Sequence, residues 1–277
     1  MLGRVCVDVL GRSRALHVDA TDRNAIDDEV RIDVTRDPLP LWSLLERRRY
    51  DVVINAIGIL RDRILADPGG ALREAIAVNA LFPHDLAAHA ALAGARVIHI
   101  STDAVFAGRH GAPYDEAAAP APSDAYSASK WIGEPQSPSA LTVRCSIIGR
   151  GRVETAGLLG WFRSLPAGAT AGGFDDYRWT PATTVQVAQL LQRLLEPRVF
   201  DELRALSSLF HYAPNAPLSK WEMLRALNAL RRDEIRLERV SHPGGPVNLS
   251  LATRFDAFRQ LAAEPRPWPA VLSEVWL

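Results

Sequence analysis

The chain has 277 residues, 48% of them hydrophobic and 23% charged, and its formal net charge is zero. These values are typical of a globular protein with a sizeable core, and the scattered arginines form no basic stripe, so nucleic acid is not expected as the main partner. The longest apolar run, residues 52–60, is too short to span a membrane, and Asp8 interrupts the first apolar stretch, so neither a membrane helix nor a signal peptide is predicted.

In chain order, Val- and Ile-rich runs alternate with helical patterns. A helix is predicted over the opening residues 2–12, and strands at residues 15–19, 30–34, 51–57, 95–101 and 141–148. Helices are predicted at residues 39–49, at 70–93 with a break or kink at Pro83, and from about Tyr126. Continuous apolar strands that alternate with helices indicate a Rossmann-like, doubly wound parallel sheet.

After Gly149 the pattern changes. Thr183 with Gln186, and Ser219 with Glu222, have the spacing of capping boxes at the starts of two helices. One strand candidate, LFHYA, lies between these helices, and loops surround them. We therefore expect residues 1–149 to form the dinucleotide-binding region and residues 150–277 mainly a smaller mixed substrate-binding lobe.

Tyr126 and Lys130 form the pattern Tyr-x-x-x-Lys in a chain with only two lysines among 32 basic side chains. Residues four apart share a helix face, and an ammonium beside a phenol lowers the phenol pKa from about 10. Such a tyrosine could protonate a carbonyl oxygen during hydride transfer. Thr102 and Asp103 follow an apolar strand, where ligands collect in open α/β sheets, so Thr102 is expected to orient the same oxygen.

Residues 96–134, RVIHISTDAVFAGRHGAPYDEAAAPAPSDAYSASKWIGE, resemble the extended short-chain dehydrogenase/reductases, within them the dTDP-4-dehydrorhamnose reductase group. The similarity continues through DVVINAIG, AVNA and LTVRCSIIG, and more weakly through residues 208–227. The resemblance implies a catalytic set of Thr102, Tyr126 and Lys130, with the lysine also binding the nicotinamide ribose. A compact ammonium suits that contact better than a guanidinium does.

The resemblance also implies a cofactor site. The residues that match it, besides Tyr126 and Lys130, are Gly3, Arg23, Asp33, Val34, Ala56, Ile57, Gly58 and Asn79. Arg23 suits the 2′-phosphate of NADP, whereas Asp19 would suit NAD, so NADP is the expected cofactor and NAD the alternative.

One departure from the family lies at the front. The family's Gly-x-x-Gly-x-x-Gly fingerprint follows a first strand, but Gly3 matches only its third glycine, and the first strand has no counterpart. Either residues upstream of the recorded start are missing, which the intact Tyr126–Lys130 pair favours, or the chain is complete and binds dinucleotide poorly or not at all. A missing central strand would leave unpaired backbone on both neighbours.

The resemblance implies a dTDP- or UDP-linked 4-keto-6-deoxy sugar as substrate. Residues expected beside it are Thr102, Asp103, Ile147, Arg150 and Trp161, with Ile147 where rhamnose-pathway reductases carry an aromatic. A 4-epimerase or a dehydratase is the enzymatic alternative, but residues 104–105 offer no second carboxylate, so reduction is favoured. A non-catalytic protein that binds a nucleotide or a partner is the other alternative.

Cys6 and Cys145 are too few for a disulfide framework, and no histidine or cysteine cluster has metal-ligand spacing. We therefore expect a cytoplasmic protein without a metal site. The oligomeric state stays open, with a homodimer as one expectation.

Overall fold

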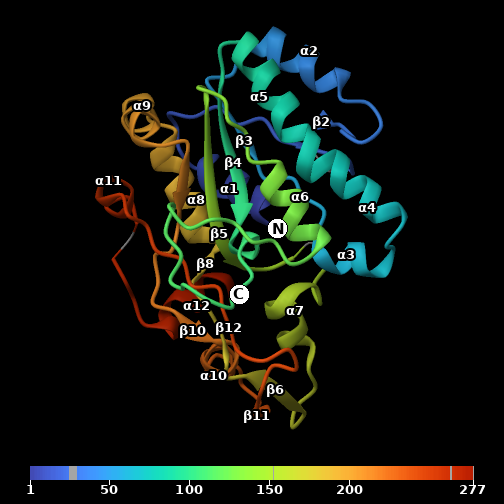
Figure 1. The fold of residues 1–277 in the computed structure, drawn as a ribbon, viewed down its shortest axis with the longest axis vertical. Coiled ribbons are helices and arrows are strands. Elements are labelled where there is room, and N and C mark those ends of the chain that lie inside the picture. Colours follow the sequence, from blue (N-terminus) through green and yellow to red (C-terminus); the bar gives the residue numbers. More distant parts are fainter. Residues whose placement is uncertain (25–29, 152, 263, 277) are drawn as a thin grey trace.

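The structure, a computed structural model, describes residues 1–24, 30–151, 153–262 and 264–276. Its centre is a parallel sheet in which β3, β4 and β5 follow one another, and both β8 and β9 pair with β5 (Figure 1). The strands of this sheet are β3 (Val52–Asn55), β4 (Arg96–Thr102), β5 (Ala140–Ile148), β8 (Pro181–Thr183) and β9 (Leu209–His211).

Helices cover both faces of the sheet, because the side chains of β4 alternate between two apolar clusters. Ile98 and Ile100 belong to one cluster, together with α1 (Leu2–Leu10), α8 (Thr184–Leu194) and α9 (Pro197–Leu206). Val97 belongs to the other, with α2 (Leu39–Arg48) and α5 (Phe82–Leu92). Figure 1 shows α8 and α9 to the left of the sheet and α2, α5 and α6 (Ala125–Ile132) to its right. The predicted doubly wound α/β architecture is confirmed.

The segment 70–93 is broken, but by a different device from the one predicted. It consists of α4 (Gly70–Ala75), a π-helical stretch η1 (Ile76–Leu81) and α5, and Pro83 lies in the first turn of α5, where proline is tolerated. The irregular turn carries Asn79, which is fully buried. π-Helical turns frequently occur at functional sites because they re-aim side chains.

The edge of the sheet beyond β3 differs from the prediction. Residues 15–19 form no strand; the pairing begins later, between β1 (Thr21–Asp22) and β2 (Val30–Arg31), which make a separate two-stranded sheet. Leu16 and Val18 pack partly buried against the core instead. Within the described residues, β3 is paired only with β4, and residues 15–19 form no ladder on its other edge.

Residues after Gly149 contribute to the sheet and also form much of a third apolar cluster, which includes Phe162, Trp179 and Leu224. LFHYA was predicted within the added lobe, but β9 pairs with β5 through Phe210 opposite Val143, and α8 packs against α1. The remaining strands are β6 (Thr170–Phe174), β7 (Tyr177–Trp179), β10 (Leu218–Ser219), β11 (Arg236–Val240) and β12 (Val247–Asn248). The remaining helices are α3 (Arg61–Ala66), the 3₁₀ turn η2 (Asp103–Val105), α7 (Gly157–Ser164), α10 (Lys220–Asn228), α11 (Asp256–Arg259) and α12 (Trp268–Trp276).

Two predicted helix starts in this part are confirmed. Thr183 accepts a hydrogen bond from the backbone of Gln186 at the start of α8, and Ser219 does the same with Glu222 at the start of α10. In both capping boxes the side chain of the later residue, Gln186 or Glu222, accepts a hydrogen bond from the backbone N–H of the capping residue. Two backbone donors are therefore satisfied at the N-terminus of each helix.

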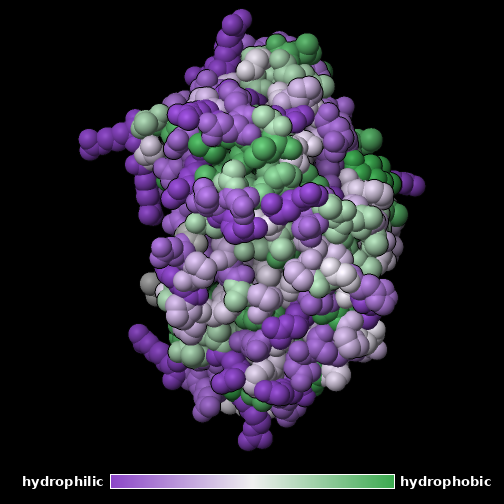
Figure 2. Space-filling model, turned by 60° about the vertical axis from the view of Figure 1, so that its left-hand side comes forward, coloured by the Kyte–Doolittle hydropathy of each residue, from purple (hydrophilic) through white to green (hydrophobic). Residues whose placement is uncertain are grey.

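The surface is mainly hydrophilic on the face shown in Figure 2, with hydrophobic residues gathered in a patch in the upper half. Among the helices that the structure describes, none combines the length and the apolar character needed to cross a bilayer.

Candidate active site

The end of β4 carries the first polar group of the site. Thr102 is the N-cap of η2: its Oγ1 accepts a hydrogen bond from the backbone of Ala104 at 3.1 Å and donates to Asp103 Oδ1 at 3.1 Å. Both residues are buried. A threonine hydroxyl has a single proton, so in this structure that proton is directed at the Asp103 carboxylate.

The start of α6 brings a phenol to this hydroxyl. Asp124 caps the helix in a capping box with Ser127, which fixes where the first turn begins. The partly buried Tyr126 lies in that turn; burial raises the pKa of its phenol, and the nearby Thr102 side chain opposes that rise. The two residues, 24 positions apart in the sequence, therefore meet at the carboxyl end of β4.

Lys130 lies one turn further along α6, buried behind the phenol. Its Nζ donates to the backbone oxygen of Ile100 at 2.8 Å and lies 3.5 Å from Nε2 of His99. Burial lowers the Lys130 pKa to about 8, against the opposing effect of Glu134. The ammonium is thus anchored to β4, and one backbone oxygen uses one of its three protons.

The predicted lowering of the Tyr126 pKa is not observed. Burial raises this pKa to about 12, and the charged groups that also act on the phenol are Asp103 and Arg61 rather than Lys130. The desolvation penalty on a phenolate therefore outweighs any stabilisation by the ammonium. At neutral pH Tyr126 is a protonated phenol, the form that can donate a proton.

The loop after β3 lies where the cofactor was predicted. Ile57 and Gly58 are exposed and Ala56 is partly buried. Asn79 holds this loop: its side chain accepts from the Ile59 amide at 2.8 Å and donates to the Ile59 oxygen at 2.9 Å. It also donates to Ser129 on α6 at 3.1 Å, so the π-helical turn links the loop to the helix that carries Tyr126 and Lys130.

Other predicted cofactor residues are engaged elsewhere. Arg23 forms an ion pair with Glu74 at 2.7 Å. Asp33 accepts hydrogen bonds from Thr35, which lower its pKa, and Val34 packs between two apolar clusters. Gly3 lies in the first turn of α1 with nothing within 4 Å of the place a side chain would occupy.

The predicted substrate residues lie apart from one another. Ile147 lies on β5, partly buried against the core. Arg150 lines a cavity of about 200 Å³ beside α7. Trp161 is exposed on α7, and its described ring contact is with Phe162.

The structure adds residues that the sequence analysis did not select. Ser146 on β5 is hydrogen-bonded to Asp103, and Lys220 at the start of α10 interacts electrostatically with the same carboxylate. Tyr177 and Trp179 on β7 place their rings beside the Lys220 ammonium. The signal available in the sequence was the second lysine of an arginine-rich chain.

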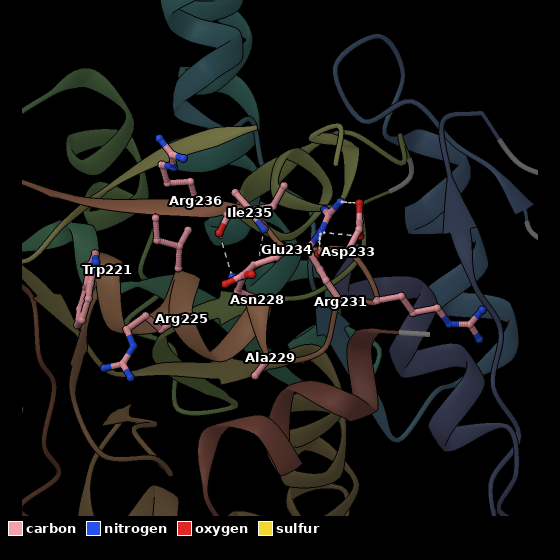
Figure 3. Close-up of a pocket in the computed structure, with 11 residues that line it drawn as sticks. Trp221, Arg225, Asn228, Ala229, Arg231, Asp233, Glu234, Ile235 and Arg236 are labelled. Atoms are coloured by element: carbon pink, nitrogen blue, oxygen red, sulfur yellow. Dashed lines mark hydrogen bonds and ion pairs between the residues drawn. The ribbon is translucent and has the colours of Figure 1, made fainter. Parts of the chain in front are cut away.

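A separate cavity of about 630 Å³ lies between α10 and β11 (Figure 3). None of its lining residues belongs to the set around Thr102. Its Arg231 is already bonded to Asp233 and to the backbone oxygens of Phe162 and Leu165. This cavity is therefore separate from the residues around Thr102. Across the described residues, no group of three or more His, Cys, Asp or Glu side chains is arranged to hold a metal.

A buried ion pair supports the site from behind. Arg144 on β5 binds Glu134 through two hydrogen bonds of 2.7 and 2.8 Å, and Ser101 donates to the same carboxylate at 2.6 Å. Glu134 follows α6 and Ser101 lies on β4, so the pair ties together the two elements that carry Lys130 and Thr102.

Comparison with known proteins identifies the family of the chain. Residues 3–250 match the family model described as RmlD substrate binding domain. A Haloferax volcanii protein named probable low-salt glycan biosynthesis reductase Agl14 is 34% identical over 197 residues, covering 68% of this chain and 62% of that protein. The chain thus spans about six tenths of that relative's length.

Solved structures share the fold at lower identity. A dTDP-4-dehydrorhamnose reductase from Clostridium acetobutylicum superposes with a TM-score of 0.77 at 21% identity, covering 99% of this chain and 94% of that one. A dTDP-4-dehydrorhamnose reductase from Bacillus anthracis in complex with NADP gives 0.71 at 18% identity, covering 88% and 86%. By the match to the family model over most of its length, the chain belongs to the RmlD substrate binding domain family.

Proposed function

We propose that this protein is an NADP-dependent reductase of a nucleotide-linked 4-keto-6-deoxy sugar. The observation that carries the proposal is the approach of Tyr126 to Thr102 at the carboxyl end of β4, where burial raises the phenol pKa and Thr102 opposes that rise, with the Lys130 ammonium bonded to the same strand. In open α/β sheets this end of the strands is where ligands bind. The names of the relatives, which include a glycan biosynthesis reductase and dTDP-4-dehydrorhamnose reductases, support the substrate class.

In this proposal Tyr126 donates the proton to the substrate's carbonyl oxygen. Its raised pKa keeps the phenol protonated, and an oxygen that becomes an alkoxide is the stronger base. Before substrate binds, the Thr102 hydroxyl donates its hydrogen bond to Asp103. The hydroxyl must therefore rotate to donate to the carbonyl oxygen of the substrate and orient that carbonyl.

The residues present fit a nicotinamide cofactor, which would supply the hydride. Lys130 has protons left for ribose hydroxyls after its bond to Ile100, and Ile57 and Gly58 are exposed in the loop after β3. The B. anthracis neighbour's complex with NADP supports the choice of NADP, with NAD as the alternative. Arg23 would hold a 2′-phosphate only by leaving its pair with Glu74.

The test is NADPH consumption with dTDP-4-dehydrorhamnose, measured for the parent protein and for Tyr126→Phe. We expect the variant to lose at least about 100-fold in kcat, because general acid catalysis contributes about 10²–10⁴-fold. Its affinity for NADPH should stay within about threefold of the parent. Equal rates in the two proteins would exclude Tyr126 as the acid. No consumption by either, with NADPH bound, would favour a binding protein over an enzyme.

A further inference from the structure

Lysine is rare in this chain, and both lysines lie at the same site. Lys130 and Lys220 are the two among 32 basic side chains. Lys130 approaches from α6 and is bonded to β4, whereas Lys220 approaches from the start of α10 and interacts with Asp103. Two compact ammonium groups thus flank the Thr102–Tyr126 pair from different elements, in a chain that elsewhere uses guanidinium.

The Lys220 ammonium faces aromatic rings and has no oxygen partner in the described part of the chain. Its Nζ lies 3.6 Å from the centre of the Trp179 ring and 5.0 Å from that of Tyr177. Ring faces attract the charge but accept no conventional hydrogen bond, so the ammonium protons stay available. The capping box of Ser219 and Glu222 fixes the helix start from which the side chain extends.

Asp103 offers the complementary acceptor. Its carboxylate accepts a hydrogen bond from Thr102 at 3.1 Å, and burial raises its pKa to about 6, with Lys220, Thr102 and Ser146 opposing the rise. Lys220 opposes that rise but forms no direct ion pair with it among the described contacts. The ammonium and the carboxylate therefore interact electrostatically without a direct ion pair among the described contacts.

A hydroxyl group matches this arrangement because it both accepts and donates. Its oxygen can accept from an ammonium while its proton goes to a carboxylate, and charged partners make each bond stronger than a neutral one. We propose that Lys220 and Asp103 together bind a substrate hydroxyl on a carbon next to the carbonyl carbon. The hydroxyl is placed next to the carbonyl carbon because Asp103 follows Thr102 in the chain and accepts its hydrogen bond. The inference rests on the proposed reduction of a keto sugar.

The two-lysine composition allows a direct test on the whole protein. Labelling with [ε-¹³C]lysine gives two side-chain signals, and Lys220→Arg assigns them. We expect dTDP-rhamnose to shift the Lys220 signal and dTDP alone to leave it in place. An equal shift with dTDP would point to a phosphate contact and overturn the proposal. Binding of dTDP-rhamnose by calorimetry without a Lys220 shift would overturn it as well.

Kinetics give an independent check. Lys220→Met and Asp103→Asn should each lower kcat/KM by about 10- to 100-fold, the loss expected for one hydrogen bond to a charged group. The double variant should be little worse than the poorer single one, since both residues bind the same hydroxyl. Arg225→Met on the same helix is the matched control and should behave as the parent.

The outcomes separate this inference from the proposed function. Absence of dTDP-rhamnose binding and of turnover would overturn the proposed function, and the inference with it. Normal turnover with unchanged kcat/KM in Lys220→Met would overturn only the hydroxyl subsite. NADPH affinity, measured by fluorescence, should be unchanged in Lys220→Met. A loss of that affinity would place Lys220 at the cofactor and overturn the proposal.

Discussion

The buried pair of Arg144 and Glu134 should be the most costly place to remove a single charge. Both side chains are almost completely buried, at 3% and 6% of their exposed area. In Arg144→Met the carboxylate loses both guanidinium bonds and keeps Ser101 as its donor. Removing one partner of a buried ion pair typically costs about 3–5 kcal/mol, because the remaining charge is uncompensated.

Urea unfolding followed by circular dichroism measures this loss. The matched control is Arg198→Met, whose single hydrogen bond to Glu202 is equally short at 2.8 Å but lies at the surface, so its loss should be far smaller than that of Arg144→Met. Adding Glu134→Gln to Arg144→Met should recover part of the stability, since the unpaired charge disappears. A loss under about 1 kcal/mol in Arg144→Met, or no recovery in the double variant, would refute the reasoning.

Three further predictions concern the same region. In Gly133→Ala, the new Cβ would lie 1.7 Å from the backbone oxygen of Asn79, so we expect a loss of at least about 1–3 kcal/mol in thermal unfolding. Gly3→Ala, with open space in a helix, should be neutral or stabilising, and equal effects of the two would contradict the packing argument. Asn79→Ala removes both bonds to Ile59, so the Ile59 amide should exchange hydrogen faster; unchanged protection would exclude the link. For Asp103 the folded pKa of about 6 lies above the unfolded value of 3.8, so the native state binds more protons between these values. Its contribution to stability is therefore complete below about pH 4 and lost as the pH rises through 6. Urea unfolding across this range should show a flatter pH dependence in Asp103→Asn than in the parent.

The sequence alone was sufficient for the architecture and for part of the site. Apolar runs long enough to be buried on both faces predict the central strands β3, β4 and β5, and local capping patterns predict the starts of α8 and α10. The spacing of Tyr126 and Lys130 depends only on the helical repeat. These features are set by neighbours in the chain, so they are readable without a fold.

Tertiary structure decided what depends on residues distant in the sequence. Residues 15–19 have strand-like composition but form no ladder, whereas β9 pairs with β5 and joins the main sheet. The bond from the Lys130 ammonium to the backbone oxygen of Ile100 could not be predicted from the sequence. The rise of the Tyr126 pKa could not be predicted either, because desolvation depends on all the groups that pack around the phenol. Lys220 lies 117 positions from Asp103, and only the folding of α10 against the sheet brings the second lysine to the carboxylate.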